Sequence, residues 1–101
     1  MKRYECARLI REVPKAHGVH ADTAEADGRM VFVELSSVMR DEFYNAYNAG
    51  LRPEIVARLE LAEDYQDEKL VELKGKRYRV IRTYMTADDG IELTLQRWDV
   101  K

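Results

Sequence analysis

The chain has 101 residues, 46% of them hydrophobic and 36% charged, with a formal net charge of −2. This length suits a single domain, residues 1–101, and the composition excludes an intrinsically disordered chain. The slight acidity argues against a free-standing nucleic-acid binder, which usually carries a basic excess. One cysteine allows no intramolecular disulfide. Because no apolar run is long enough for a signal peptide or a membrane span, we expect no membrane contact and synthesis in the cytoplasm.

The N-terminal part predicts two strands separated by a long loop. Tyr4–Val13 alternates imperfectly and is the first expected strand, in which Cys6 is expected to be a buried small hydrophobe. Residues 14–28 are small and polar without periodicity, which predicts a long exposed loop, a kind of segment that is often functional or mobile. Met30–Leu35 is the second strand, and its nearly continuous apolar sequence indicates that both of its faces are covered.

A short α-helix is expected over residues 39–49, inside a helix–arm segment of residues 36–54. Ser36 and Ser37 are candidate N-caps. Gly50 is a candidate left-handed residue just past the last turn, and Pro53 prevents the helix from continuing.

The expected helix has two different sides. One apolar stripe contains Met39, Phe43, Ala46, Tyr47 and Gly50. A helix this short is marginal alone, so we expect Phe43 and Tyr47 to pack on their own domain. The residues one turn apart away from that stripe are Arg40, Tyr44 and Asn48. Tyr44 is therefore the candidate for a partner surface.

The C-terminal half predicts further strands joined by tight turns. The expected elements are a half-buried strand at Ile55–Leu61, an acidic loop at Ala62–Glu68, a hairpin of Lys69–Leu73 and Lys76–Met85 turning at Lys74-Gly75, and a last strand at Ile91–Trp98. The total is about six strands and one short helix. Short connections favour antiparallel pairing, so the expected fold is mainly β, a small antiparallel β-barrel or sandwich.

Neither of two clusters of ionisable residues makes a convincing active or metal site. His17 and His20, with Asp22 nearby, have divalent-metal chemistry but lack a rigid framework, so solvated loop histidines are favoured. Six acids follow in a polar stretch with no sign of burial: Glu60, Glu63, Asp64, Asp67, Glu68 and Glu72. Without burial, such carboxylates acquire no separated pKa values for acid–base work. We therefore expect no enzyme activity, no metal and no cofactor.

A basic stretch comes directly after the acids. It contains Lys74, Lys76, Arg77, Arg79 and Arg82, interleaved with Tyr78 and Tyr84. Bases and rings together bind nucleic acid, but strand alternation puts Arg77 and Arg79 on one face and the two tyrosines on the other. Two alternatives remain. Acids and bases pair across neighbouring strands, or they meet head-to-tail between subunits and close a ring. The latter makes Arg77, Arg79, Glu63, Asp64, Asp67 and Glu68 interface candidates.

Several segments in order resemble the head-closure proteins of siphophages, also called stopper or head–tail joining proteins. They are Arg40–Ala46 (RDEFYNA), Gly50–Glu54 (GLRPE), Lys74–Tyr78 (KGKRY), Ile81–Tyr84 (IRTY) and Ile91–Leu93 (IEL), and the resemblance covers roughly Val33–Leu95. Two positions depart from the family pattern. Met39 stands where a serine helix cap is frequent, and Tyr47 stands where a small residue is common.

The resemblance implies a small β-barrel bearing a short helix, and a virion protein rather than an enzyme. Family members form a ring beneath the portal and adaptor, retain packaged DNA and present the docking surface for a tail-completion or tail-tube protein. DNA passes through the lumen without sequence-specific contact, and an acidic lumen would let it slide. The helix–arm candidates for subunit or partner contact are Arg40, Glu42, Tyr44, Asn48 and Arg52. Either residues 36–53 or the 14–28 loop, with His17, His20 and Asp22, reaches the channel. The alternatives are a small β-barrel nucleic-acid-binding module and a neighbouring tail-completion or neck protein.

Overall fold

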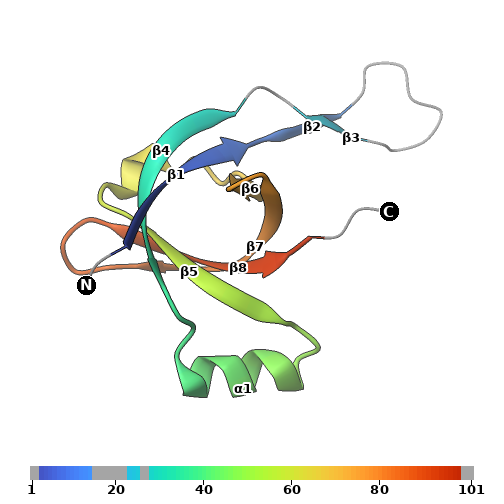
Figure 1. Cartoon of the computed structure of the whole chain (residues 1–101), viewed down its shortest axis with the longest axis vertical. Helices are drawn as coiled ribbons and strands as arrows, with labels where there is room; N and C mark the ends of the chain where they lie inside the picture. Colours follow the sequence, from blue (N-terminus) through green and yellow to red (C-terminus); the bar gives the residue numbers. More distant parts are fainter. Residues whose placement is uncertain (1–2, 15–22, 26–27, 99–101) are drawn as a thin grey trace.

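The computed structural model describes residues 3–14, 23–25 and 28–98, and it is mainly β with one short helix, as the sequence predicts (Figure 1). The strands are β1 (Arg3–Ile10), β2 (Glu12–Pro14), β3 (Thr23–Glu25), β4 (Arg29–Ser36), β5 (Pro53–Leu59), β6 (Leu70–Leu73), β7 (Lys76–Met85) and β8 (Ile91–Arg97). The helix is α1 (Arg40–Asn48), and a 3₁₀ turn, η1, covers Ala62–Asp64.

Six of the strands form a closed barrel in the order β1-β4-β5-β8-β7-β6 (Figure 1). Every neighbouring pair is antiparallel, including the closing pair of β1 and β6. Of the two expected architectures, the barrel is therefore the one the chain adopts. Closure gives the ladder no terminal strand, which removes most of the edge that an open sheet exposes.

The barrel interior is filled by alternate residues of β1, β4, β5, β6 and β8, against which the partly buried Tyr78 and Val80 of β7 pack. The buried cluster consists of Ala7, Leu9, Val33, Ala57, Leu59, Val71, Leu73, Ile91, Leu93 and Leu95. On β8 this is a strict period of two, because successive side chains of a strand point to opposite faces. Full burial of a leucine or valine side chain contributes about 1.5–3 kcal/mol, so this cluster is the main source of stability.

The hairpin between β6 and β7 turns at Lys74 and Gly75, as predicted. Both residues have positive φ, 51° and 75° respectively. A two-residue hairpin turn of this hand requires φ > 0 at both central positions, which is easy for glycine. Leu73 and Lys76 are directly opposite each other across the turn.

The N-terminal segment differs from the prediction. The expected strand over residues 4–13 is broken at Arg11, so that β1 ends at Ile10 and β2 begins at Glu12. The expected 14–28 loop contains β3, which pairs antiparallel with β2 in a ribbon that extends away from the barrel (Figure 1). A three-residue strand is too short to show a period, which is why the sequence did not indicate it. His17, His20 and Asp22 lie outside the described residues.

The outer faces of β1 and β4 are uncovered, which contradicts two predictions. Cys6 is exposed rather than buried, and its register partner Phe32 is 73% exposed. Met30 is also exposed, so only one face of β4 is covered. The reason is alternation: Ala7 and Val33 occupy the interior, so their strand neighbours must point outward.

An irregularity in β7 overturns a third prediction. The pairing of β7 with β8 shifts register between Val80 and Arg82. Before the shift, Tyr78 packs against the core, whereas after it Tyr84 is 64% exposed. The two tyrosines were expected on one face and lie on opposite faces, because a β-bulge inserts one extra residue and inverts the alternation beyond it.

Candidate functional site

Helix α1 begins without a side-chain cap. Its N-cap residue is Met39, whose side chain makes no capping hydrogen bond, so the expected capping by Ser36 or Ser37 is wrong. The first helical bond runs from the Phe43 N–H to the Met39 carbonyl, at 2.8 Å. Asp41 in the first turn complements the positive end of the helix dipole.

The C-terminal end of α1 is fixed by its backbone, as predicted. Gly50 has φ of 85° and donates its N–H to the Tyr47 carbonyl at 3.0 Å. The next residue, Leu51, donates to the Ala46 carbonyl at 2.8 Å. These two bonds form a Schellman motif, in which a left-handed residue ends the helix and satisfies its last carbonyls.

Polar contacts hold α1 over the outer face of β5 and β8. Glu42 Oε1 accepts a hydrogen bond of 2.9 Å from the Thr94 hydroxyl. Thr94 and its register partner Val56 face away from the core yet are buried, which places the helix above them. Beyond the helix, the Arg52 N–H donates to Gln96 Oε1 at 2.7 Å. Glu42, expected at a partner surface, instead binds its own barrel.

The outward side of α1 is aromatic. Phe43, Tyr44 and Tyr47 are 37%, 58% and 50% exposed, and no residue of the helix is buried. The Phe43 ring centroid lies 6.0 Å from that of Tyr44 and 6.1 Å from that of Tyr47. With Met39, which is also exposed, these three residues form what we call the aromatic face.

The aromatic face carries positive charge at its margin. The Arg52 guanidinium lies 3.9 Å above the Tyr47 ring centroid, a cation–π contact that orients both groups. Arg40 and Asn48 are exposed, like Tyr44, as expected. Phe43 and Tyr47 were expected to pack on their own domain, but neither ring is buried: Phe43 is 37% exposed, and Tyr47 is 50% exposed beneath Arg52.

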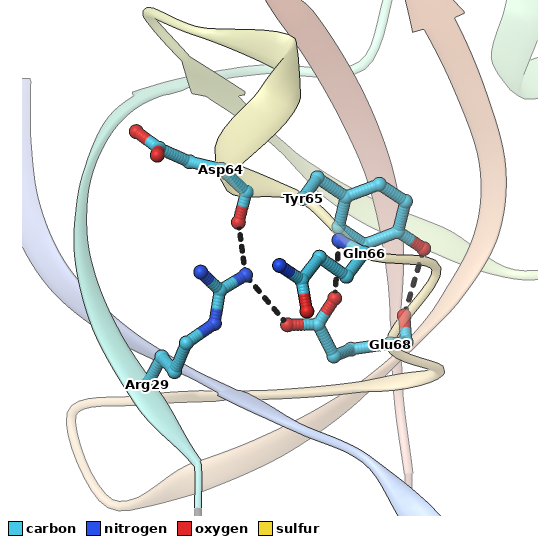
Figure 2. A network of polar contacts seen from close by, with 5 residues as sticks. All are labelled: Arg29, Asp64, Tyr65, Gln66 and Glu68. Carbon is cyan, nitrogen blue, oxygen red and sulfur yellow. Dashed lines mark hydrogen bonds and ion pairs between the residues drawn. The ribbon is translucent and has the colours of Figure 1, made fainter.

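The acidic stretch contains a buried carboxylate, which the sequence did not indicate (Figure 2). Glu68 is 4% exposed. Its carboxylate accepts hydrogen bonds from Arg29 Nη2 at 3.3 Å and from the Gln66 N–H at 2.5 Å. The Tyr65 hydroxyl donates to the Glu68 carbonyl at 2.7 Å, and Arg29 also donates to the Asp64 carbonyl. The expectation that these acids lie in an unburied loop is therefore wrong at Glu68.

This network covers one end of the barrel. Arg29 is the register partner of the core residue Leu9, and Tyr65 is partly buried against the core. Burial raises the pKa of Tyr65 to about 12, and the charges of Asp67 and Glu68 act in the same direction. Glu68 is used inside the fold and is not available to a neighbouring subunit. The other candidates of this stretch, Glu63, Asp64 and Asp67, are exposed.

Some acids and bases pair across neighbouring strands, as one of the alternatives expected. Arg77 Nε lies 3.9 Å from Oε2 of its register partner Glu72, and Lys74 Nζ lies 3.0 Å from Glu5 Oε1. Such exposed pairs contribute about 0–1 kcal/mol each, so they adjust the surface more than they stabilise the fold.

The bulge in β7 creates a basic strip on the outer face. Arg79 is opposite Gln96, Arg82 is opposite Thr94 and Tyr84 is opposite Glu92, so all three of these β7 residues point outward. Arg82 and Tyr84 line a shallow groove beside α1 together with Glu42, Asn45, Glu92 and Thr94. Bases and a ring thus share one face, contrary to the prediction, with two carboxylates among them.

Within residues 3–14, 23–25 and 28–98, no group of three or more histidine, cysteine or carboxylate side chains is arranged to hold a metal ion. In the same part of the chain, no helix is both long and apolar enough to span a bilayer.

No protein-family model matches the chain, and no curated protein is significantly similar to it in sequence. The candidate functional site therefore rests on geometry, and the aromatic face of α1 is its strongest element.

Removal of the Glu68 carboxylate is expected to destabilise the fold. In Glu68→Ala the Gln66 N–H and the Arg29 guanidinium lose their acceptor, which costs about 1–3 kcal/mol. Glu63→Ala is the matched control, because it removes the same charge from an exposed position of the same stretch and should change stability by no more than about 0.5 kcal/mol. Urea unfolding measures both, and equal effects would contradict the assigned role.

The raised pKa of Tyr65 predicts a loss of stability at high pH. The phenol ionises near 10.0 in the unfolded chain and near about 12 in the folded one, so its contribution is complete below pH 10 and disappears as pH rises towards 12. The difference in free energy of unfolding between the wild type and Tyr65→Phe should shrink over that window. A difference that does not vary with pH, measured by urea unfolding, would show that Tyr65 does not titrate this way.

Proposed function

We propose that this chain is a head–tail connector component of a tailed bacteriophage or prophage, of the head-closure type. It forms a ring under the portal and adaptor, retains packaged DNA and provides the docking surface for the tail. The observation that carries the proposal is the aromatic face of α1, which lies outside a closed barrel with Met39, Phe43, Tyr44 and Tyr47 exposed. Exposed aromatic clusters of this kind mark protein–protein contact sites.

The way α1 is inserted supports a role in contact. It lies in the connection between β4 and β5, which are neighbours in the barrel, and it sits outside the ring of strands (Figure 1). None of its residues is buried, so the helix adds no side chain to the interior of the barrel. A nine-residue helix held by a Schellman motif and one side-chain bond suits presentation of a surface to a partner.

The segments that resemble the head-closure family also fall on coherent parts of the molecule. They cover α1 with its arm, the β6–β7 hairpin and the start of β8. Asp64 lies beside the network that Figure 2 shows, and Glu63 and Asp67, exposed like Asp64, are within three residues of it in the chain. Exposed carboxylates repel the DNA backbone, which suits a protein past which DNA slides rather than binds.

The test is electron microscopy of particles made with and without the gene. Without it, we expect heads that lack tails and lose their DNA. Supply of the wild-type chain should restore tailed, filled particles, whereas Phe43→Ser with Tyr44→Ser should not. Lys76→Ser, an exposed substitution away from α1, is the matched control and should restore them. Tailed and filled particles in the absence of the gene would contradict the proposal.

The second candidate function is a nucleic-acid-binding module, which the basic strip of β7 favours. The bulge brings Arg79, Arg82 and Tyr84 onto one outward face, where phosphate contacts and base stacking can act together. Glu92 and Glu42 in the adjoining groove weaken this candidate, because their charges oppose a polyanion.

Single-stranded DNA binding separates the two functions. If the module binds DNA, fluorescence anisotropy should show an affinity that falls steeply with salt and is lost in Arg79→Glu with Arg82→Glu. Arg3→Glu with Arg40→Glu gives the same change of net charge elsewhere on the surface and should retain binding. No binding at low salt would remove this candidate.

A further inference from the structure

A second exposed apolar surface lies on the outer wall of the barrel, over β1 and β4. The outer faces of β1 and β4 expose Tyr4 and Phe32, which are 59% and 73% exposed, and the chain after β5 adds Leu61. These three side chains line an open groove of about 540 Å³ whose other lining residues are charged. They are Glu34, Arg58, Glu60 and Asp88. We call this the apolar groove.

The rim of the apolar groove is negative. Its one arginine, Arg58, forms an ion pair with Asp88, and the charges of Glu34 and Glu92 also act on it. A hydrogen bond from the Thr86 hydroxyl, and secondly one from Arg58, lowers the pKa of Asp88 to about 2. This carboxylate is therefore charged at neutral pH. With Glu34 and Glu60 added, the acids of the rim outnumber the single arginine.

The aromatic face of α1 has the complementary character. Arg40, Phe43, Tyr44 and Tyr47 are spaced i, i+3, i+4 and i+7, the spacing by which a helix docks into an apolar groove. Arg40 and Arg52 flank the rings and carry positive charge. An apolar helix face with a positive margin therefore exists on the same chain as an apolar groove with a negative rim.

The two surfaces cannot meet within one chain. The Glu42–Thr94 bond and the Schellman motif hold α1 over β5 and β8, at the end where β4 finishes and β5 starts. The groove lies over β1 and β4 and beside the far end of β5. A contact between them therefore joins different copies. It is heterologous, because the helix face of one copy binds the groove of the next, which is a different surface.

We propose that α1 of one copy docks by its aromatic face into the apolar groove of a neighbouring copy, and that this contact builds the ring. The inference rests on the proposed function and names the subunit interface of that assembly. It covers the apolar outer faces of β1 and β4, which nothing covers in the part of the chain that the structure describes. A heterologous contact whose rotation closes produces a ring.

Cysteine cross-linking tests the contact, because the chain's single cysteine, Cys6, is exposed beside Phe32 at the groove. In Tyr44→Cys, oxidation should produce a ladder of disulfide-linked oligomers through Cys6 of one copy and position 44 of the next. The same variant with Cys6→Ser should give no disulfide-linked species at all, and Lys76→Cys, which places an exposed thiol at the start of β7, should give no ladder. A disulfide-linked dimer in the variant with Cys6→Ser means that position 44 of one copy meets position 44 of another, a helix-to-helix contact that would overturn the proposal.

Mixing provides a second, independent measurement. Phe32→Ser removes one ring of the groove, and Phe43→Ser with Tyr47→Ser removes two rings of the helix face. All three positions are exposed, so the fold should be retained, as circular dichroism can verify. Each variant alone should remain monomeric at concentrations where the wild type associates, and their equimolar mixture should stop at a dimer. Larger species in the mixture, or a wild type that is monomeric at every concentration and yields no ladder with Tyr44→Cys, would overturn the interface.

The two proposals fail in different ways. If particles without the gene are tailless but the Tyr44→Cys chain forms no link to Cys6 within assembled particles, the connector function stands and this interface falls. If such particles are tailed and filled, the function falls whatever the cross-linking shows.

Discussion

Closure of six antiparallel strands around one apolar interior is the constraint on which the rest of this molecule depends. A barrel gives each strand one face to the core, and the period of two then sends every other side chain outward. The inward set, such as Leu9, Leu93 and Leu95, is fully buried. The outward set is decided by that choice, which is why Phe32 and Cys6 reach the surface in strands of apolar sequence.

The helix obeys a different rule. It is held by backbone geometry at Gly50 and by the bond from Thr94 to Glu42, and it adds nothing to the buried cluster. Exposed apolar patches that add nothing to a core promote aggregation, so the presence of one on α1 needs another reason. Under the proposed function, contact with a partner is that reason, and the charged margin at Arg40 and Arg52 would orient the contact.

Some charged side chains of this chain form contacts within the fold, and others remain at the surface. Glu68 and Arg29 close one barrel end, and Glu72 pairs with Arg77 across a hairpin. In the sequence these residues look like the other acids and bases around them, but in the fold they form ion pairs within the chain. Other charges remain at the surface, including Glu34 and Glu60 at the apolar groove and Arg40 and Arg52 beside the aromatic face. In the proposed interface these unlike charges would meet between two copies.

Local signals in the sequence were sufficient for much of the fold. The Lys74-Gly75 turn, the left-handed Gly50 and the strict alternation of Ile91, Leu93 and Leu95 each depend on a few adjacent residues. Their order predicts a small barrel or sandwich with one helix, and closure of the strands made it the barrel. The same local reasoning identified Tyr44 as exposed.

Tertiary structure alone decided which side of each element is used. One extra residue in β7 moves Tyr84 to the outer face, and only the pairing with β8 reveals it. Burial of Glu68 depends on Arg29, 39 residues away, and the attachment of Glu42 depends on Thr94, 52 residues away. The sequence determines turns, caps and periods because their physics is local. It leaves open which face meets the core or a neighbour, because that free energy comes from residues brought together only when the barrel closes.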